Sequence, residues 1–311
     1  MRFSKRLKRR YKSVSRAIKY WIGLQLLKAL LHILPLFPLS LLERFGRIIG
    51  SVARILMRES RELAQSNLRL AFPELTEEEM CRIGKRTAQL LLVNAFQVVW
   101  MAGHREKIWE LIEVEGLDHL ETALSSGKGA ILLGAHFGNF MLQCLRLGFE
   151  RFAFSTIVNM PKAERLNSLI SERALEMGLN IISRDPPWGA TREVIRRLGE
   201  NEVVCVIADE EARKGGVFVE FFGYEVPTPK GPAMFALRSG APILPVFIYR
   251  LGGMRQRIVI EPPLNPPDYA DDEAFIESNT AAMAAIIENT IRRHPEEWSW
   301  ITHRWRKRRN K

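Results

Sequence analysis

One histidine in this sequence stands where a titratable side chain can do chemistry. The segment Gly129–Met141 opens with a short apolar run that ends at small residues, and His136 follows beside Gly138 and Asn139. This pattern predicts a buried strand that ends in a tight turn carrying one imidazole. Neutral imidazole accepts a proton readily near neutral pH, so His136 is a candidate general base. The alternative for a single histidine is a structural role in the core or in the turn.

A carboxylate follows a second apolar run of the same kind. Residues 203–207 have the composition of a buried strand, and Asp209 opens the polar turn directly after them, followed by Glu210 and Glu211. In sheets of parallel strands, reactive side chains gather at the carboxyl ends of the strands. We therefore expect His136 and Asp209 to converge on one cleft.

The elements that would hold these side chains alternate along the chain from residue 112 onward. Strands are expected at 112–114, 130–133, 152–158, 180–182, 203–207, 243–248 and 256–260, and helices at 118–125, 140–148, 164–177, 189–198 and 232–239. Such alternation predicts an α/β fold with a mainly parallel mixed sheet flanked by helices. Gly and Pro punctuate the segment 215–232. Either a loop wall for an apolar ligand or a covered hairpin fits that segment.

Positive charge is concentrated at the two ends of the chain. Residues 1–20 contain nine Lys or Arg and no acid, and residues 304–311 contain six more. The rest of the sequence holds 31 basic and 35 acidic residues. This distribution disfavours a nucleic-acid binder and indicates ends that meet an anionic membrane surface. Interleaved with the second basic run are tryptophans that we expect at the level of lipid headgroups: Trp298, Trp300 and Trp305.

Residues 21–58 are strongly apolar but interrupted, and we expect this helical segment to associate with a membrane. Lys28, His32, Pro35 and Pro38 divide the run into pieces too short to span a bilayer alone. A single span with a cytoplasmic N-terminus and an interfacial helical hairpin broken at the prolines both remain open. A wholly soluble helix pair is the alternative. The expected organisation is a basic tail at 1–20, this segment at 21–58, and a domain with a helical lead-in at 59–311.

Several motifs in order resemble one family of enzymes. They are Gly134-Ala-His-Phe-Gly-Asn139, Asn67-Leu with Phe72-Pro-Glu74, Gly215-Gly-Val-Phe-Val219, Thr228-Pro-Lys-Gly-Pro232, and Trp298-Ser-Trp300 with His303-Arg-Trp305. Together they resemble the bacterial lipid A biosynthesis acyltransferases of the lauroyl/myristoyl type, in the lysophospholipid acyltransferase superfamily. The resemblance implies an enzyme on the cytoplasmic face of the bacterial inner membrane. It implies transfer of a fatty acyl chain from acyl carrier protein or coenzyme A to a hydroxyl of a lipid A precursor or related glycolipid, with no metal or other cofactor.

The family's catalytic signature is a histidine, four intervening residues, and then Asp or Glu. His136 matches the histidine, whereas Met141 occupies the acidic position. Either the enzyme is weakened or inactive and only binds lipid, or another carboxylate orients His136. Asp209 and its two neighbouring glutamates are the candidates for that substitute.

Further residues are expected to bind substrate, and the resemblance assigns one of them. Arg173 corresponds to a family position suited to a phosphate, with a helix-surface ion pair as the alternative. Backbone amides near Gly138 and Asn139 are expected to stabilise the oxyanion. Glu210 completes the expected substrate-binding set.

Overall fold

A sheet of seven strands forms the centre of the computed structural model, which describes residues 21–23, 25–26, 28–212, 214–264 and 270–309. The expected basic tail at 1–20 lies outside the described residues. The strand order is β1-β9-β8-β2-β5-β3-β4. The strands are β1 (Ile112–Glu115), β2 (Ala130–Gly134), β3 (Phe154–Val158), β4 (Leu179–Ser183), β5 (Val203–Ile207), β8 (Ile243–Gly252) and β9 (Arg255–Ile260).

The sheet is mainly parallel and mixed, as predicted. β8, β2, β5, β3 and β4 run parallel to one another, whereas β9 is antiparallel to β8, and β1 follows the direction of β9. In the register of β2 and β5, Gly134 pairs with Ile207. The two central strands therefore end side by side, and the turns that follow them start from adjacent points on one edge of the sheet.

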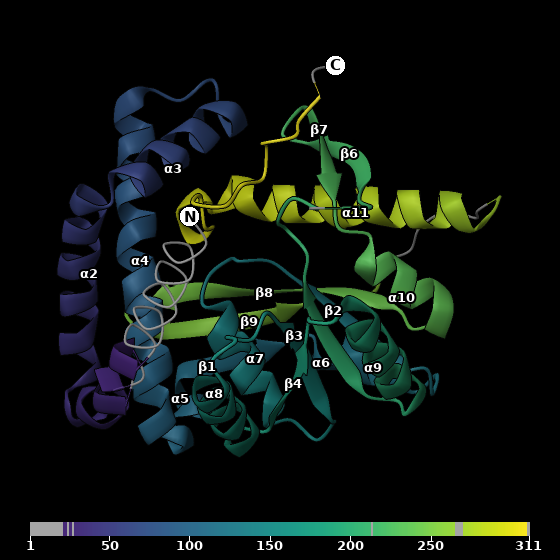
Figure 1. Cartoon of the computed structure of the whole chain (residues 1–311), viewed down its shortest axis with the longest axis horizontal. Coiled ribbons are helices and arrows are strands. Elements are labelled where there is room, and N and C mark those ends of the chain that lie inside the picture. The colour runs from purple at the N-terminus through teal and green to yellow at the C-terminus, as the bar shows by residue number, and fades with distance from the viewer. Residues whose placement is uncertain (1–20, 24, 27, 213, 265–269, 310–311) are drawn as a thin grey trace, which may run out of the picture.

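Helices cover both faces of the sheet (Figure 1). α6, α7 and α8 pack on one face, and α9, α10 and α11 pack on the other. β2 supplies both cores because successive side chains alternate between the faces: Ile131 and Leu133 point to one, Ala130 and Leu132 to the other. The helices are α5 (Ile108–Leu111), α6 (Leu117–Leu124), α7 (Phe140–Gly148), α8 (Glu164–Glu176), α9 (Pro187–Gly199), α10 (Gly231–Ser239) and α11 (Asp272–Arg293).

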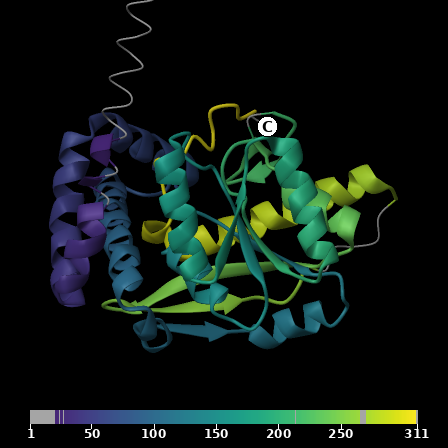
Figure 2. The same ribbon diagram turned by 60° about the horizontal axis from the view of Figure 1, so that its bottom comes forward.

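A helical lead-in stands beside the sheet. It comprises η1 (Leu34–Leu36), α2 (Leu39–Leu56), α3 (Arg58–Ala71), α4 (Glu77–Gly103) and η2 (Arg105–Lys107). Thr76 and Glu79 form a reciprocal capping box, which fixes the start of α4 directly after Thr76. α2 is the outermost layer, with α4 between it and the sheet (Figures 1 and 2).

Two glycines let α2 lie close to α4. Gly46 and Gly50 are buried on the inner face of α2, and a Cβ at Gly46 would lie 2.8 Å from a methyl group of Val93. The chain reaches α2 through a break at the two prolines, since helical residues 28–33 give way to η1 and α2 starts at Leu39. None of the helices within the described residues combines the length and the apolar composition needed to cross a bilayer.

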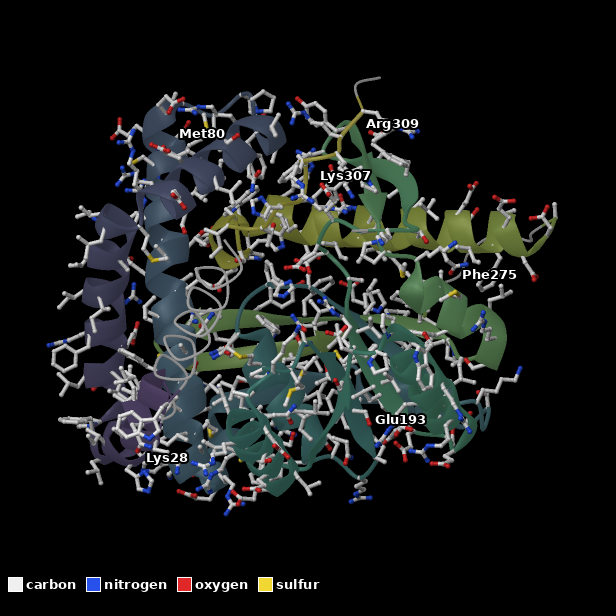
Figure 3. The ribbon with its side chains drawn as sticks, viewed as in Figure 1. Lys28, Met80, Glu193, Phe275, Lys307 and Arg309 are labelled. Atoms are coloured by element: carbon white, nitrogen blue, oxygen red, sulfur yellow. The ribbon has the colours of Figure 1, made fainter. Side chains whose placement is uncertain are left out.

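The segment 215–232 contains a hairpin, so the second of the two predicted alternatives is confirmed. β6 (Val217–Phe221) pairs antiparallel with β7 (Tyr224–Thr228), and the hairpin packs against α11. The chain after η3 (Pro295–Glu297) runs beside this hairpin, where Figure 3 labels Lys307 and Arg309. The Arg309 N–H donates to the Glu225 carbonyl oxygen at 2.9 Å, which ties this last segment to β7.

The tryptophans of this last segment belong to the core. Trp298, Trp300 and Trp305 are each 2% exposed or less, and the Trp300 and Trp305 rings stack with centroids 6.4 Å apart. The expectation that they lie at the level of lipid headgroups is wrong. A run of alternating aromatic and basic residues suits a membrane interface, but here the hairpin and α11 bury the rings, and Arg304 is buried with them.

Candidate active site

His136 lies in the turn that connects β2 to α7. The main chain of the segment 297–299 holds this turn: the Gly138 N–H donates to the Glu297 carbonyl oxygen at 2.9 Å, and the Ser299 N–H donates to the His136 carbonyl oxygen at 3.1 Å. Phe137 forms a bridge with Trp298 between these bonds. The end of strand β2 therefore positions the imidazole. A segment from a distant part of the sequence fixes the backbone of the turn.

The carboxylate of Asp209 receives three hydrogen bonds, two of them from His136. The imidazole Nδ1 lies 2.8 Å from Oδ1 of Asp209, and the His136 N–H donates to Oδ2 at 3.0 Å. The Trp298 indole Nε1–H also donates to Oδ2, at 2.7 Å. The Asp209 side chain is completely buried, whereas the His136 side chain remains 30% exposed. With Nδ1 on the carboxylate, Nε2 is the ring nitrogen left to act on a substrate.

The pKa values of His136 and Asp209 are shifted in opposite directions. Burial lowers the pKa of His136, but the charge and hydrogen bond of Asp209 outweigh burial, so that pKa is raised above its ordinary value. Burial acts to raise the pKa of Asp209, but the His136 charge and the hydrogen bonds from His136 and Trp298 outweigh it and lower that pKa. The arrangement suits a base that accepts a proton at Nε2 while Asp209 stabilises the imidazolium.

A buried polar network supports the turn from below. The Asn94 side chain on α4 donates to the Gly138 carbonyl oxygen at 2.9 Å, and Arg250 on β8 donates to Asn94 at 2.6 Å. Arg250 also forms an ion pair with Glu297 at 3.4 Å. The four groups close a loop around the backbone of Gly138, whose φ of +56° favours glycine. Sequence reasoning missed this network because its members come from four separate segments.

The side chain of Asn139 has a structural role. Its Oδ1 accepts from the Leu142 N–H at the start of α7, and its Nδ2 donates to Asn94 and Gln97. Asn139 is 1% exposed, so its amide group is committed to the cap and the network. The backbone donor expected at Gly138 is likewise engaged by Glu297.

The comparison with known protein families decides what kind of protein carries this site. A family model described as "Bacterial lipid A biosynthesis acyltransferase" matches residues 7–307. The chain belongs to this family. The earlier resemblance is thereby confirmed over nearly the whole length of the chain.

The names of the similar proteins specify different acyl chains or different lipids. The lipid A biosynthesis palmitoleoyltransferase of Escherichia coli (strain K12) is 28% identical over 295 residues, which are 93% of this chain and 91% of the relative. The lauroyltransferase of the same organism is 26% identical over the same shares. The phosphatidylinositol mannoside acyltransferase of Mycobacterium tuberculosis (strain ATCC 25618 / H37Rv) is 31% identical over 65% of this chain. That match spans 63% of the mycobacterial protein's length.

The position that carries the acidic residue of the lipid A acyltransferase signature lies beside the pair. Met141 is in the first turn of α7 and is 43% exposed. The carboxylate that contacts Nδ1 of His136 is that of Asp209, which follows the end of β5. Glu210 is exposed and near enough for its charge to raise the pKa of His136 further, whereas the Glu211 side chain is 5% exposed and accepts from the Lys307 N–H.

The structure does not bring Arg173 to His136. Arg173 lies in the last turn of α8, where it pairs with Glu176 at 2.8 Å, and both side chains are about half exposed. α8 leads into the start of β4, which is parallel to β2 through β3 and β5. Arg173 is therefore near the edge where the strands begin, whereas His136 follows the edge where they end.

Proposed function

We propose that this protein transfers a fatty acyl chain from a thioester to a hydroxyl of a lipid A precursor or related glycolipid, with His136 as the general base. The hydrogen bond between His136 and the buried carboxylate of Asp209 is the observation that carries the proposal. Membership of the lipid A acyltransferase family supports the acyl chain and the lipid acceptor. The relatives' names supply the glycolipid class, since both lipid A and a phosphatidylinositol mannoside carry sugar hydroxyls.

The reaction balances with the groups at the site. Nε2 of His136 removes the proton from the acceptor hydroxyl, and the hydroxyl oxygen attacks the thioester carbonyl carbon. The tetrahedral intermediate collapses as its carbon–sulfur bond breaks, and the imidazolium returns the proton to the departing thiolate. The products are an oxygen ester and a free thiol. N–H groups at the start of α7, beside His136, are the donors we assign to the developing oxyanion.

Asp209 performs the task that the family assigns to the residue at position 141. A carboxylate on Nδ1 selects the tautomer with a free Nε2 and stabilises the imidazolium, whichever strand it comes from. The Asp209 carboxylate already occupies this place with a contact of 2.8 Å. This geometry favours an active enzyme over the alternative of an inactive, lipid-binding member of the family.

The assay that tests the function uses the purified protein with acyl carrier protein or coenzyme A thioesters and a lipid A precursor. We expect ester formation that His136→Ala abolishes. Met141→Glu is expected to change kcat by less than about threefold, because Asp209 already holds Nδ1. No His136-dependent transfer from either donor would contradict the proposed function. A gain of a hundredfold or more in Met141→Glu would instead identify the native enzyme as catalytically impaired.

We also propose that α2 attaches the enzyme to the cytoplasmic face of the inner membrane. Its outer surface, opposite the glycines that contact α4, exposes apolar side chains at helical spacing: Phe45, Ile48, Ile49, Val52, Ile55 and Leu56. Arg44 is exposed on the same helix, whereas Arg47 pairs with Glu43 and Arg54 contacts Cys81 of α4. An apolar stripe of this kind with an exposed arginine beside it suits the interface of an anionic bilayer.

Vesicle sedimentation measures this attachment. Ile48→Ser/Val52→Ser/Ile55→Ser is expected to release most of the protein from vesicles that contain anionic phospholipid, because it removes buried apolar area at the interface. The control is Arg196→Ser/Glu200→Ser, an exposed pair at the end of α9 whose removal changes no net charge. Equal binding of the α2 variant and the native protein would rule out this face as the anchor.

A further inference from the structure

A hollow lies outside the His136 site, between two helices that cover one face of the sheet. It has a volume of about 560 Å³ and lies between α9 and α10. Trp188, Thr191, Arg192 and Ile195 line it from α9, and Met234 and Arg238 line it from α10. The reaction proposed above uses none of these residues. Figure 1 shows the two helices next to each other at one side of the sheet.

The side chains of the hollow are arranged as a groove between two helices. On α9 they follow the spacing i, i+3, i+4 and i+7, which is one face of a helix, and on α10 they are four residues apart. Trp188 is 72% exposed, an unusual state for the largest apolar side chain. Its ring, with Ile195 and Met234, gives the groove an apolar floor that nothing in the described part of the chain covers.

The charges in the groove differ from those on the rest of α9. Arg196 and Arg197 are neutralised by ion pairs with Glu193, Glu200 and Glu202. Figure 3 labels Glu193 on this helix. Within the part of the chain that the structure describes, no ion pair or side-chain hydrogen bond engages Arg192 or Arg238, and both are exposed. The two arginines on the walls of the groove are therefore left to an acidic partner.

The groove is placed where a donor can serve His136. α9 leads into β5 and contacts it, and α10 leads into β8 and contacts β2. Because β5 and β8 run parallel to β2, both helices begin at the edge of the sheet where His136 and Asp209 lie. Trp188 is in the first turn of α9, so it marks the end of the groove nearest that edge.

We propose that this groove docks an acidic amphipathic helix of the protein that carries the acyl thioester. The inference rests on the proposed function and chooses between its two donors. A helix laid between α9 and α10 would place apolar residues on Trp188 and Met234 and acidic residues beside Arg192 and Arg238. The long apolar floor with one arginine on each wall suits a helix better than a nucleotide, whose phosphates require donors that converge on one point. The exposed Trp188 is a suitable anchor residue for such an interface.

The test compares two donors with the same acyl chain in the full-length enzyme. The variant Arg192→Glu/Arg238→Glu is assayed with lauroyl-acyl carrier protein and with lauroyl-coenzyme A. We expect the KM for the carrier protein to rise at least about tenfold with kcat unchanged, because two attractive charges become repulsive. The KM for the coenzyme A thioester is expected to stay within about twofold. Arg151→Glu, an exposed arginine before β3 at the opposite edge of the sheet, is the matched control.

Other outcomes overturn the inference. An unchanged KM for the carrier protein, or a rise for coenzyme A alone, would remove the groove as the docking site and leave the proposed function intact. If neither donor supports His136-dependent transfer, the function fails separately, and direct titration of the acidic carrier protein decides the docking. In that titration the carrier protein should quench or shift the tryptophan fluorescence of the native enzyme, and Trp188→Ala should lose this response. A native-like response in the double variant would contradict docking.

Discussion

Asp209→Asn is expected to lower kcat for acyl transfer by about four orders of magnitude, the scale seen when a catalytic histidine loses its carboxylate partner. An amide at this place presents either an NH₂ group or a neutral oxygen to Nδ1 of His136. The first case selects the wrong tautomer, and the second leaves the imidazolium without a stabilising charge. Acylation of the glycolipid under saturating donor and acceptor measures the effect.

The matched control for this substitution is Glu172→Gln on α8, away from the His136 turn. It removes the same charge from an exposed side chain, so we expect kcat within about threefold of the native value. Thermal unfolding of both variants separates catalytic loss from loss of structure. A decrease of less than tenfold in a folded Asp209→Asn variant would show that the pair does not function as proposed.

The pH dependence follows from the same pair. Neutral His136 is the base, so kcat/KM should fall as the pH drops through the pKa of His136, which Asp209 raises above the ordinary value. In Asp209→Asn burial still lowers the pKa of His136, and only the smaller effect of Glu210 opposes it, so the acid limb of the remaining activity should move to lower pH. For folding, the raised pKa of His136 contributes stability at pH values below its unfolded pKa, lost as pH rises through the folded value. The lowered pKa of Asp209 contributes stability above its unfolded value, lost as pH falls.

Trp305→Ala is expected to cost about 3–5 kcal/mol of unfolding free energy, as large-to-small substitutions of buried aromatics do. The indole is 2% exposed and stacks on Trp300, and it packs against Phe221 and Phe222 of the hairpin. Its removal leaves a cavity between the hairpin and the last segment of the chain. The shift of the urea unfolding midpoint, converted with a common m value, measures the loss.

A tryptophan elsewhere in the fold provides the control. Trp188→Ala removes the same atoms from a side chain that is 72% exposed, so stability should change by no more than about 0.5 kcal/mol. Comparable losses in the two variants would mean that Trp305 is not part of the core.

The sequence allowed the sheet and half of the site to be predicted, for a physical reason. Strands such as β2 and β5 are short apolar runs bounded by turn residues, and parallel strands place their ends together, so His136 and Asp209 followed from local patterns. Trp298 could not be found in this way, because its hydrogen bond to Asp209 joins residues 89 apart in the sequence. No local signal distinguishes an indole that donates a hydrogen bond to a carboxylate from one that faces lipid.

The tryptophans of the last segment show where composition misleads. They were expected at lipid headgroups, although β6 and β7 provide a protein surface that buries them. Phosphate binding by Arg173 stays a prediction, and the structure adds that this residue pairs with Glu176 at the end of a helix near the opposite sheet edge. Which surface a side chain contacts depends on long-range packing in both cases.

Backbone hydrogen bonds join the His136 turn to the segment 297–299. The site is therefore complete only when the last part of the chain has been synthesised. A nascent chain that has reached residue 290 contains His136, Asp209 and every strand of the main sheet. It still lacks the Trp298 donor to Asp209 and the main-chain partners of Gly138 and of the His136 carbonyl. The hydrogen bonds that order the proposed base therefore form only after the segment that follows α11 has been synthesised.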